Sequence, residues 1–519
     1  MESLSKFGKG VLLIGLALWV TIVALIVIYE IRFPGTDVFL FKEAAVNFAL
    51  KSKLVASNLV YMPLDKEMPF AHYPPVYPTV FGLWMKVFGI GLKQSILFEC
   101  IVRGLRSLLL AALIWPFLKN ALNERKIRIW GFFTVLFFLL LSIVSTDDDR
   151  PDELGLVIGL SSWWVLMRAK HLYQYILSGL LLGLTAATSP ACSVAIGFGT
   201  LSYFFFRVKQ LRPFVFLSLG AGLTFAASVL PILLAHGEVV KRFSSSANAS
   251  SLPYPLPWQK GVTWERFLSR VEYCMNHYFA LGFKLTFCFL AVLSIAILMR
   301  EKSRFKIHPF QISAVVFALI APFVWSLQPY YLWFSVLPLS VFFIASLLKQ
   351  NQTNRIFGFL GLLVAFFPLF FHESKMFVTV AHQPREEKSE FVREKLLQHI
   401  RPGERIAISP DQFFTLRKYR EVANINFVCH SLSKFDYVYV TRMWSAKQGH
   451  PTAVDIPCWA VNQVKCFEPI ENLSLNYPLI LGGLNTGYVT RGNGGTLYKN
   501  TKCTEKVPKQ VASGFPVHF

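Results

Sequence analysis

Charged residues are scarce in this sequence. They make up 16% of its 519 residues, and the mean hydropathy is +0.46. Because soluble domains usually carry about 25% charged residues, this composition excludes an ordinary soluble enzyme. Apolar runs long enough to cross a bilayer, about 20 residues each, recur through residues 1–371. The sequence therefore predicts a polytopic α-helical membrane protein.

Acidic residues are fewer than basic ones. The chain has 30 aspartates and glutamates and 52 lysines and arginines, so its formal net charge is +22. An excess of this size is also typical of nucleic-acid-binding proteins. Here, however, the basic residues gather in short connections between apolar runs, such as "KNALNERKIR" and "MREKSRFK", where they indicate the cytoplasmic side of a membrane. We therefore expect membrane lipids as partners and no nucleic acid.

About eleven membrane-spanning helices are expected, the first of them a retained span because it is too long for a cleaved signal sequence. Lys6 and Lys9 place the N-terminus in the cytoplasm. The C-terminus then lies outside, in the periplasm if the membrane is a bacterial inner membrane, which we favour, or in the lumen of the endoplasmic reticulum in a eukaryote. The expected spans lie near residues 11–29, 95–117, 129–145, 154–167, 174–188, 190–206, 213–235, 280–299, 310–327, 331–348 and 355–371.

Two segments leave this number open. "VYPTVFGLWMKVFGI" could form a further full span, and residues 174–206 could form one helix in place of two short ones hinged near Pro190. Either change alone would move every later basic connection to the outer side. The charge pattern therefore favours eleven spans.

The composition changes after residue 371. Residues 372–519 alternate amphipathic helices with short strands such as "RIAIS", "NFVCH" and "YVYVT". This pattern predicts a small extracytoplasmic α/β domain that follows a transmembrane domain over residues 1–371. No GxGxxG motif follows the first strand, so a dinucleotide-binding fold has no support.

Cysteine is rare, with 8 residues, and half of them lie in the predicted outer domain: Cys429, Cys458, Cys466 and Cys503. Four cysteines in an outward-facing domain allow up to two disulfides in three possible pairings. A zinc site is the alternative, but no Cys-x2-Cys or histidine spacing supports it. The pairing stays open.

The first outward loop carries a carboxylate close to the membrane. Asp37 follows the first expected span by a few residues and precedes the helical segment "VFLFKEAAVNFALKS". Thr36 or Asp37 could simply cap that helix, and the local sequence favours this interpretation. Alternatively, Asp37 could act as a general base at the membrane surface.

The same loop ends in "HYPPVYP", whose prolines stiffen the chain where it returns to the bilayer. Tyr73 and Tyr77 suit the aromatic belt of a membrane interface. His72 could donate a hydrogen bond or bind a metal over a cleft, although a lone histidine is more often structural.

The second outward loop, "STDDDRPDELG", opens a helix. Pro151 followed by Asp152 and Glu153 is what a helix N-terminus prefers, so these residues need no function. The three further acids, Asp147 to Asp149, exceed what a cap needs. Arg150 supplies a planar cation suited to phosphate.

Charges inside or beside apolar segments are functional candidates by default. Glu99 and Arg103 stand four residues apart and could pair with each other, which leaves Arg106 unexplained; Lys284 stands early in an expected span. Polar and aromatic residues follow the ninth span at the outer interface: Gln328, Tyr330 and Tyr331.

Taken in order along the chain, these motifs resemble the GT-C superfamily of membrane glycosyltransferases, over about residues 10–370. The resemblance rests on "GTDVFLFKEAA", "HYPPVYPTVFGLW", "DDDRPDELG", "GLLLGLTAATSP" and "PYYLWFSVLP". The order of the first two motifs is similar to that in both the mannosyltransferase and the aminoarabinose-transferase branches of the superfamily. The protein-mannosyl branch carries an Asp-Glu pair in the first loop, whereas Val38 follows Asp37 here, so protein O-mannosylation is less favoured.

The resemblance implies an inverting enzyme that moves a sugar from a polyprenyl-phosphate carrier to a hydroxyl acceptor (a glycan, a lipid or a protein) on the outer face. Asp37 would be the general base, and Arg106, Arg150 or Lys284 would neutralise the leaving phosphate. The remaining candidates for substrate binding are His72, Tyr73, Asp152, Glu153, Gln328, Tyr330 and Tyr331. No cofactor is expected to be required; if a divalent cation takes part, Asp148 and Asp149 are its candidate ligands.

Two other classes of protein share this composition. A transporter or flippase of lipid-linked sugars places polar groups near the bilayer midplane, often in two repeated halves, whereas here the polar residues gather at the outer face. A non-catalytic scaffold would not need three long outward loops. The sequence favours the transferase.

Overall fold

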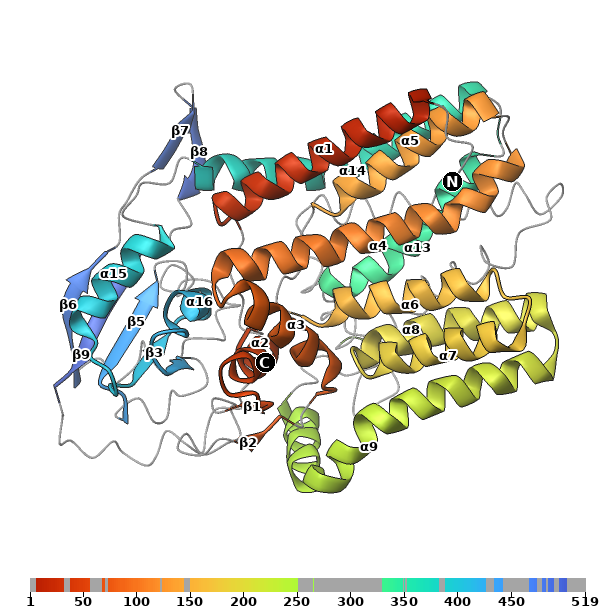
Figure 1. Ribbon diagram of the computed structural model, residues 1–519. Helices are drawn as coiled ribbons and strands as arrows, with labels where there is room; N and C mark the ends of the chain where they lie inside the picture. The colour runs from red at the N-terminus through yellow and green to blue at the C-terminus, as the bar shows by residue number, and fades with distance from the viewer. Residues whose placement is uncertain are drawn as a thin grey trace.

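Long helices and a smaller α/β part make up the computed structural model (Figure 1). The structure describes residues 6–31, 38–56, 68–70, 73–121, 124–143, 150–250, 265, 329–348, 350, 352–381, 388–425, 434–441, 466–473, 478–481, 484–489 and 494–501. The long helices run side by side, and the α/β part lies at the end of the bundle where α1 (Lys6–Ile28) finishes, away from the N-terminus.

The bundle follows the predicted order of helices wherever the structure describes it. After α1 come α4 (Leu92–Ala121), α5 (Glu124–Leu141), α6 (Asp152–Leu166), α7 (Leu172–Ala186), α8 (Pro190–Tyr203), the π-helical turn η1 (Phe204–Val208), α9 (Leu211–Ser250), α13 (Pro329–Leu347) and α14 (Gln352–Ala381). The spans expected near 280–299 and 310–327 lie outside the described residues. Helix α14 continues ten residues past the predicted end of its span at 371.

Within the described part of the chain, one helical segment is long and apolar enough to cross a membrane by length and composition alone: Leu211–Gly237, with a mean hydropathy of 1.9. Shorter apolar stretches lie in α1, α5, α7 and α14. The number of about eleven spans stays a prediction.

Two short helices, α2 (Val38–Lys51) and α3 (Val76–Phe88), lie between the bundle and the α/β part (Figure 1). At 13 residues, α3 spans about 20 Å, which is less than the 30 Å or so of a hydrocarbon core. Because α6, α7 and α8 are similarly short, at 15, 15 and 14 residues, this length does not decide whether "VYPTVFGLWMKVFGI" is a span, and that alternative stays open. Strands β1 (Val55–Ala56) and β2 (Met68–Pro69) form a small antiparallel pair beside α2.

The segment around Pro190 forms two helices, as predicted. Helix α7 ends at Ala186, and Ser189 caps α8 by accepting a hydrogen bond from the backbone N–H of Cys192, with Pro190 in the first helical position. Helix α7 also packs closely on α9. The backbones are so near that a Cβ atom added at Gly183 would clash with the backbone of Ala221. Small residues that let two helix backbones approach are typical of membrane helix pairs.

The C-terminal region, as we call residues 388–501, contains a five-stranded sheet in the order β4-β3-β5-β9-β6. Strands β3 (Ile406–Ile408), β4 (Val422–Asn424) and β5 (Tyr437–Thr441) are parallel, and β9 (Gly495–Asn500) lies antiparallel between β5 and β6 (Phe467–Asn472). Strands β7 (Pro478–Leu481) and β8 (Leu484–Val489) form a separate hairpin. The strands predicted at "RIAIS" and "YVYVT" are confirmed, whereas "NFVCH" lies outside the described residues.

Helix α15 (Ser389–His399) precedes β3, and a 3-10 turn, η3 (Pro410–Gln412), runs into the four-residue α16 (Phe413–Leu416). The second predicted helix is thus shorter than its pattern indicates. Of the four cysteines predicted to pair, the structure describes only Cys466, which is half-buried. Their disulfides stay a prediction.

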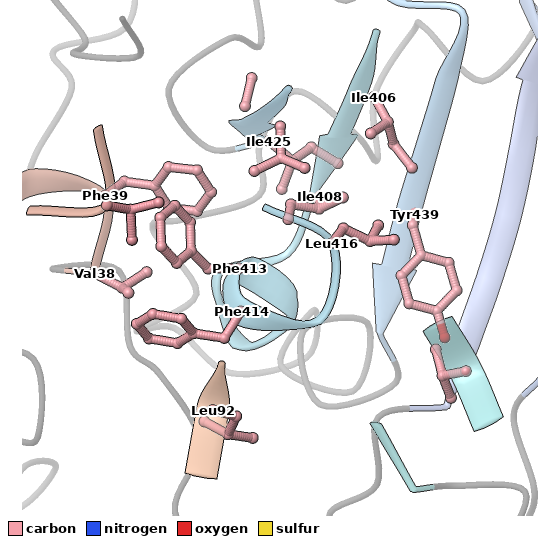
Figure 2. Close-up of a cluster of buried hydrophobic side chains, with 14 of the residues drawn as sticks. Val38, Phe39, Leu92, Ile406, Ile408, Phe413, Phe414, Leu416, Ile425 and Tyr439 are labelled. Atoms are coloured by element: carbon pink, nitrogen blue, oxygen red, sulfur yellow. The ribbon is translucent and has the colours of Figure 1, made fainter. Parts of the chain in front are cut away.

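One apolar core runs from the bundle into the C-terminal region. Figure 2 shows Val38 and Phe39 of α2 beside Phe413 and Phe414 of α16, with Ile406 and Ile408 of β3 on the side away from α2. The rings of Phe39 and Phe413 meet edge to face, with centroids 4.8 Å apart. The two parts are therefore packed together as one body at this contact.

Candidate functional site

Buried charged side chains gather at the end of the bundle that faces the C-terminal region. Helices α4, α6 and α8 all begin at this end, and α2 and α3 lie across it (Figure 1). We call this set the charged layer: Lys42, Glu99, Arg103, Arg106, Arg150, Asp152 and Glu153. The side chain of Arg150 is 12% exposed and the other six residues are buried.

One face of α4 supplies three members of the charged layer. Glu99, Arg103 and Arg106 are four and three residues apart, so they lie on the same side of the helix. Nη1 of Arg106 donates to both carboxylate oxygens of Glu153, at 2.5 and 2.6 Å. Nε of Arg103 lies 3.8 Å from Oε1 of the same carboxylate. Two guanidinium groups thus face one carboxylate in the first turn of α6.

Glu99 connects three helices. Nζ of Lys42 in α2 lies 3.1 Å from Oε1 of Glu99 and donates to the Ser95 hydroxyl at 2.9 Å. The Tyr77 hydroxyl in α3 donates to the same Glu99 oxygen at 3.0 Å. Because desolvating charges is costly, such buried ions persist only when they are paired and hydrogen-bonded. Lys42 and Glu99 meet both conditions.

The second outward loop and the α7–α8 hairpin meet at Asp152. Nε of Arg150 donates to Oδ2 of Asp152 at 2.9 Å, and the Ser189 hydroxyl donates to Oδ1 at 2.5 Å. The backbone N–H of Val76, at the start of α3, donates to the Ala187 carbonyl at 3.3 Å. The motifs "HYPPVYP", "DDDRPDELG" and "GLTAATSP" are therefore adjacent in space.

An aromatic pair borders the charged layer. The guanidinium of Arg150 lies 5.6 Å from the ring centroid of Phe41, which meets the ring of Tyr73 edge to face at 4.8 Å. Cations are attracted to the faces of aromatic rings. Of the substrate-binding candidates, Tyr73, Arg106, Arg150, Asp152 and Glu153 thus lie in or beside one site.

The other candidates lie beyond what can be described. The structure does not describe Asp37, His72, Asp148, Asp149, Lys284 or Gln328, and it gives only the backbone of Tyr330 and Tyr331, at the start of α13. Helix α2 begins at Val38, directly after Asp37. Among the described residues, no three histidine, cysteine or acidic side chains cluster as metal ligands would.

Sequence reasoning missed three members of this network: Lys42, Tyr77 as a hydrogen-bond donor, and Ser189. A signal existed for Lys42. It stands inside "VFLFKEAA", where apolar residues surround it, and a lysine in such a run is seldom buried without a partner. Asp152 and Glu153 do occupy the first turn of a helix, as predicted, but they also bind side chains from other elements.

A second charged contact joins α1 to the C-terminal region. The Ser389 hydroxyl donates to Oε2 of Glu30 at 2.5 Å, and Nζ of Lys93 lies 4.0 Å from Oε1 of Glu30 and 3.3 Å from Glu390. Burial raises the pKa of the Glu30 carboxyl above its ordinary value, and the hydrogen bond from Ser389 and the nearby Lys93 only partly offset this effect.

Comparison with protein-family models and with curated sequences gives no match. Comparison with solved structures does. ArnT from Cupriavidus metallidurans in the apo state superposes with a TM-score of 0.50 at 12% identity, covering 94% of this chain and 98% of the other. The oligosaccharyltransferase of Archaeoglobus fulgidus, tethered with an acceptor peptide, gives a TM-score of 0.50 at 11% identity, over 86% of this chain and 70% of the other. Both are GT-C glycosyltransferases.

This chain has the GT-C fold. The resemblance found in the motifs is thereby confirmed at the level of the fold, and the neighbours with this fold are polytopic membrane proteins. Lys42, Arg150, Asp152 and Glu153 of the charged layer lie in the motifs that carry the GT-C resemblance, whereas its other three members come from α4.

Proposed function

We propose that this protein is an inverting membrane glycosyltransferase that moves a sugar from a polyprenyl-phosphate carrier to a hydroxyl acceptor. The observation that carries the proposal is the burial of Arg103 and Arg106 beside the carboxylate of Glu153, at one end of a GT-C fold. Burying guanidinium groups is costly even when they are paired. A site that must hold a phosphate gives a reason to keep them.

The arginines are assigned to the leaving group. A planar guanidinium matches the geometry of phosphate oxygens, and a fixed cation stabilises the charge that develops as a phosphate leaves. Arg106 and Arg150 enter the charged layer from two elements, α4 and the start of α6. In this proposal they bind the carrier phosphate from two sides, with Lys284 as a further cation.

Asp37 is assigned as the general base. It precedes the first residue of α2, the helix that carries Lys42 into the charged layer. The carboxylate takes the proton of the acceptor hydroxyl. The oxygen then bonds to the anomeric carbon from the side opposite the carrier, and the bond between that carbon and the phosphate oxygen breaks, which inverts the configuration.

The acceptor is proposed only as a class: a glycan, lipid or protein hydroxyl. The oligosaccharyltransferase of similar fold carries a tethered acceptor peptide, which keeps a peptide among the choices. The C-terminal region packs against α2, which carries Lys42 of the charged layer, and is assigned to acceptor binding.

Substitution of the two assigned residues tests the proposal. In membranes supplied with radiolabelled polyprenyl-phosphate sugars, Asp37→Asn is expected to lower transfer by about 100-fold or more, as when a general base is removed. Arg106→Lys keeps the charge but loses the planar fork, and we expect a loss of about tenfold or more. Arg168→Lys is the matched control, because Arg168 lies beyond the opposite end of α6.

Each variant should reach the membrane in the amount of the parent, which immunodetection would check. If Asp37→Asn transferred sugar at the parental rate, Asp37 would be only a helix cap and the assignment would fall. If Arg168→Lys lost as much activity as Arg106→Lys, the role of the charged layer would fall instead.

A further inference from the structure

Residues 409–417 of the C-terminal region press against α2 on either side of Lys42; we call this segment the wedge. Phe413 of the wedge meets Phe39, three residues before Lys42, and Nη2 of Arg417 donates to Oδ1 of Asn47, five residues after it, at 2.5 Å. All of these side chains are buried. The wedge therefore holds α2 in the turn before Lys42 and in the turn after it.

The wedge also contacts Lys42 itself. Nζ of Lys42 lies 5.9 Å from the ring centroid of Phe414, and 5.1 Å from that of Phe81 in α3. The two rings contact each other, with centroids 6.5 Å apart. Figure 2 shows Phe414 on the side of the wedge that faces the bundle. Phe414 thus supplies an aromatic wall to a buried ammonium group, a favourable contact where water is excluded.

The wedge is fixed to its own sheet at the other side. The hydroxyl of Thr441, the last residue of β5, donates to Oδ1 of Asp411 at 3.1 Å, and the Thr441 N–H donates to the Ser409 hydroxyl at 3.1 Å. Asp411 and Thr441 are buried. Because these bonds tie the wedge to the central parallel strands, it is a rigid support and not a loose loop.

We infer that Phe414 is a positioning residue, which acts through Lys42 to set the geometry of the charged layer. The chain of contacts is short: Phe414 to Lys42, Lys42 to Glu99, and Glu99 on the same α4 face as Arg103 and Arg106. The C-terminal region then helps to position the side chains of the site. The consequence for catalysis rests on the proposed function, but the contact with Lys42 does not.

The test measures the reactivity of Lys42 toward a small amine-acylating reagent in the full-length protein, by quantitative mass spectrometry. Lys42 is 1% exposed and paired with Glu99, so it should react slowly in the parent. Phe414→Leu keeps an apolar side chain but removes the ring, and we expect acylation of Lys42 to rise about tenfold. Phe414→Tyr keeps the ring and should react like the parent.

Tyr419→Leu is the matched control. Tyr419 also carries cation–π contacts, with Arg393 at 5.5 Å and Lys418 at 5.7 Å, but it is 42% exposed, and these contacts stay within the C-terminal region. Its loss should leave Lys42 acylation unchanged. Equal acylation in Phe414→Leu and the parent, or a rise in Phe414→Tyr as large as in Phe414→Leu, would overturn the inference.

Sugar transfer is followed in the same three variants. We expect the maximal rate to fall about tenfold in Phe414→Leu and to recover in Phe414→Tyr, which keeps the ring that faces Lys42. If the parent itself transferred no sugar while Lys42 acylation still followed the ring, the proposed function would fail and the positioning of Lys42 would stand. If transfer followed Asp37 but ignored Phe414, the inference would fail and the function would stand.

Discussion

Glu153 is the residue on which the charged layer depends most. Its carboxylate accepts both hydrogen bonds from Arg106 and faces Arg103, while the residue itself is 7% exposed. Removing one partner of a buried ion pair lowers the stability of a protein far more than replacing both partners by apolar residues, because the remaining charge is left uncompensated. Here the loss of one carboxylate would remove a partner that two buried guanidinium groups share.

Glu153→Gln is therefore expected to lower the free energy of unfolding by about 3 kcal/mol or more. Thermal unfolding of the detergent-solubilised protein would measure it. Glu468→Gln is the control, since Glu468 is exposed on β6 and its substitution should cost almost nothing. Equal midpoints for the two variants would show that Glu153 does not hold the arginines.

Helix α2 contacts both the helix bundle and the C-terminal region. It carries Lys42 to Glu99 on one side and receives Phe413 and Arg417 of the wedge on the other. Helix α1 makes a second junction at its end, where Glu30 accepts a hydrogen bond from Ser389 of α15. Because the side chain of Glu30 is only 14% exposed and its pKa is raised, this second junction is sensitive to pH.

The sign of that sensitivity follows from linkage. The folded protein binds the Glu30 proton more tightly than the unfolded chain does, so this residue's contribution weakens as pH rises from the ordinary value of 4.5 through the raised pKa. Glu30→Gln stays neutral and still accepts from Ser389. We expect its unfolding midpoint to fall less between about pH 4.5 and pH 7 than that of the parent.

Glu468→Gln serves as the control for this pH series. It removes an exposed carboxylate on β6 that takes no part in the Glu30 junction, so the pH dependence should match the parent. A Glu30→Gln series that ran parallel to the parent over the whole range would contradict the assignment of the raised pKa to Glu30.

Elements with local signals were predictable, and contacts between distant elements were not. The start of α6 at Asp152 follows from Pro151 and two acids, the break before α8 from Pro190, and β3 and β5 from their apolar runs. Arg417 and Asn47, by contrast, are 370 residues apart in the chain. No local sequence pattern predicts the contact between Arg417 and Asn47, or the contact between Lys42 and Glu99.

At the scale of the whole molecule, a helix bundle with the GT-C fold packs against an α/β region through α2, which carries Lys42 of the candidate site. The sequence predicts long apolar helices followed by an α/β region because its composition changes after residue 371. It did not reveal that the C-terminal region shares an apolar core with α2 and α3. That core makes the C-terminal region a structural part of the site.

Transfer by the purified protein tests the central claim most directly. The parent would be placed in liposomes with radiolabelled polyprenyl-phosphate sugars and an acceptor extract, and both the chemical state and the side of the label would be followed. We predict that the label leaves its carrier, releases polyprenyl phosphate in equal amount and appears on an acceptor hydroxyl with inverted anomeric configuration. Label that stays attached to polyprenyl phosphate, whether it crosses the bilayer as a flippase would carry it or remains in place, would contradict the account.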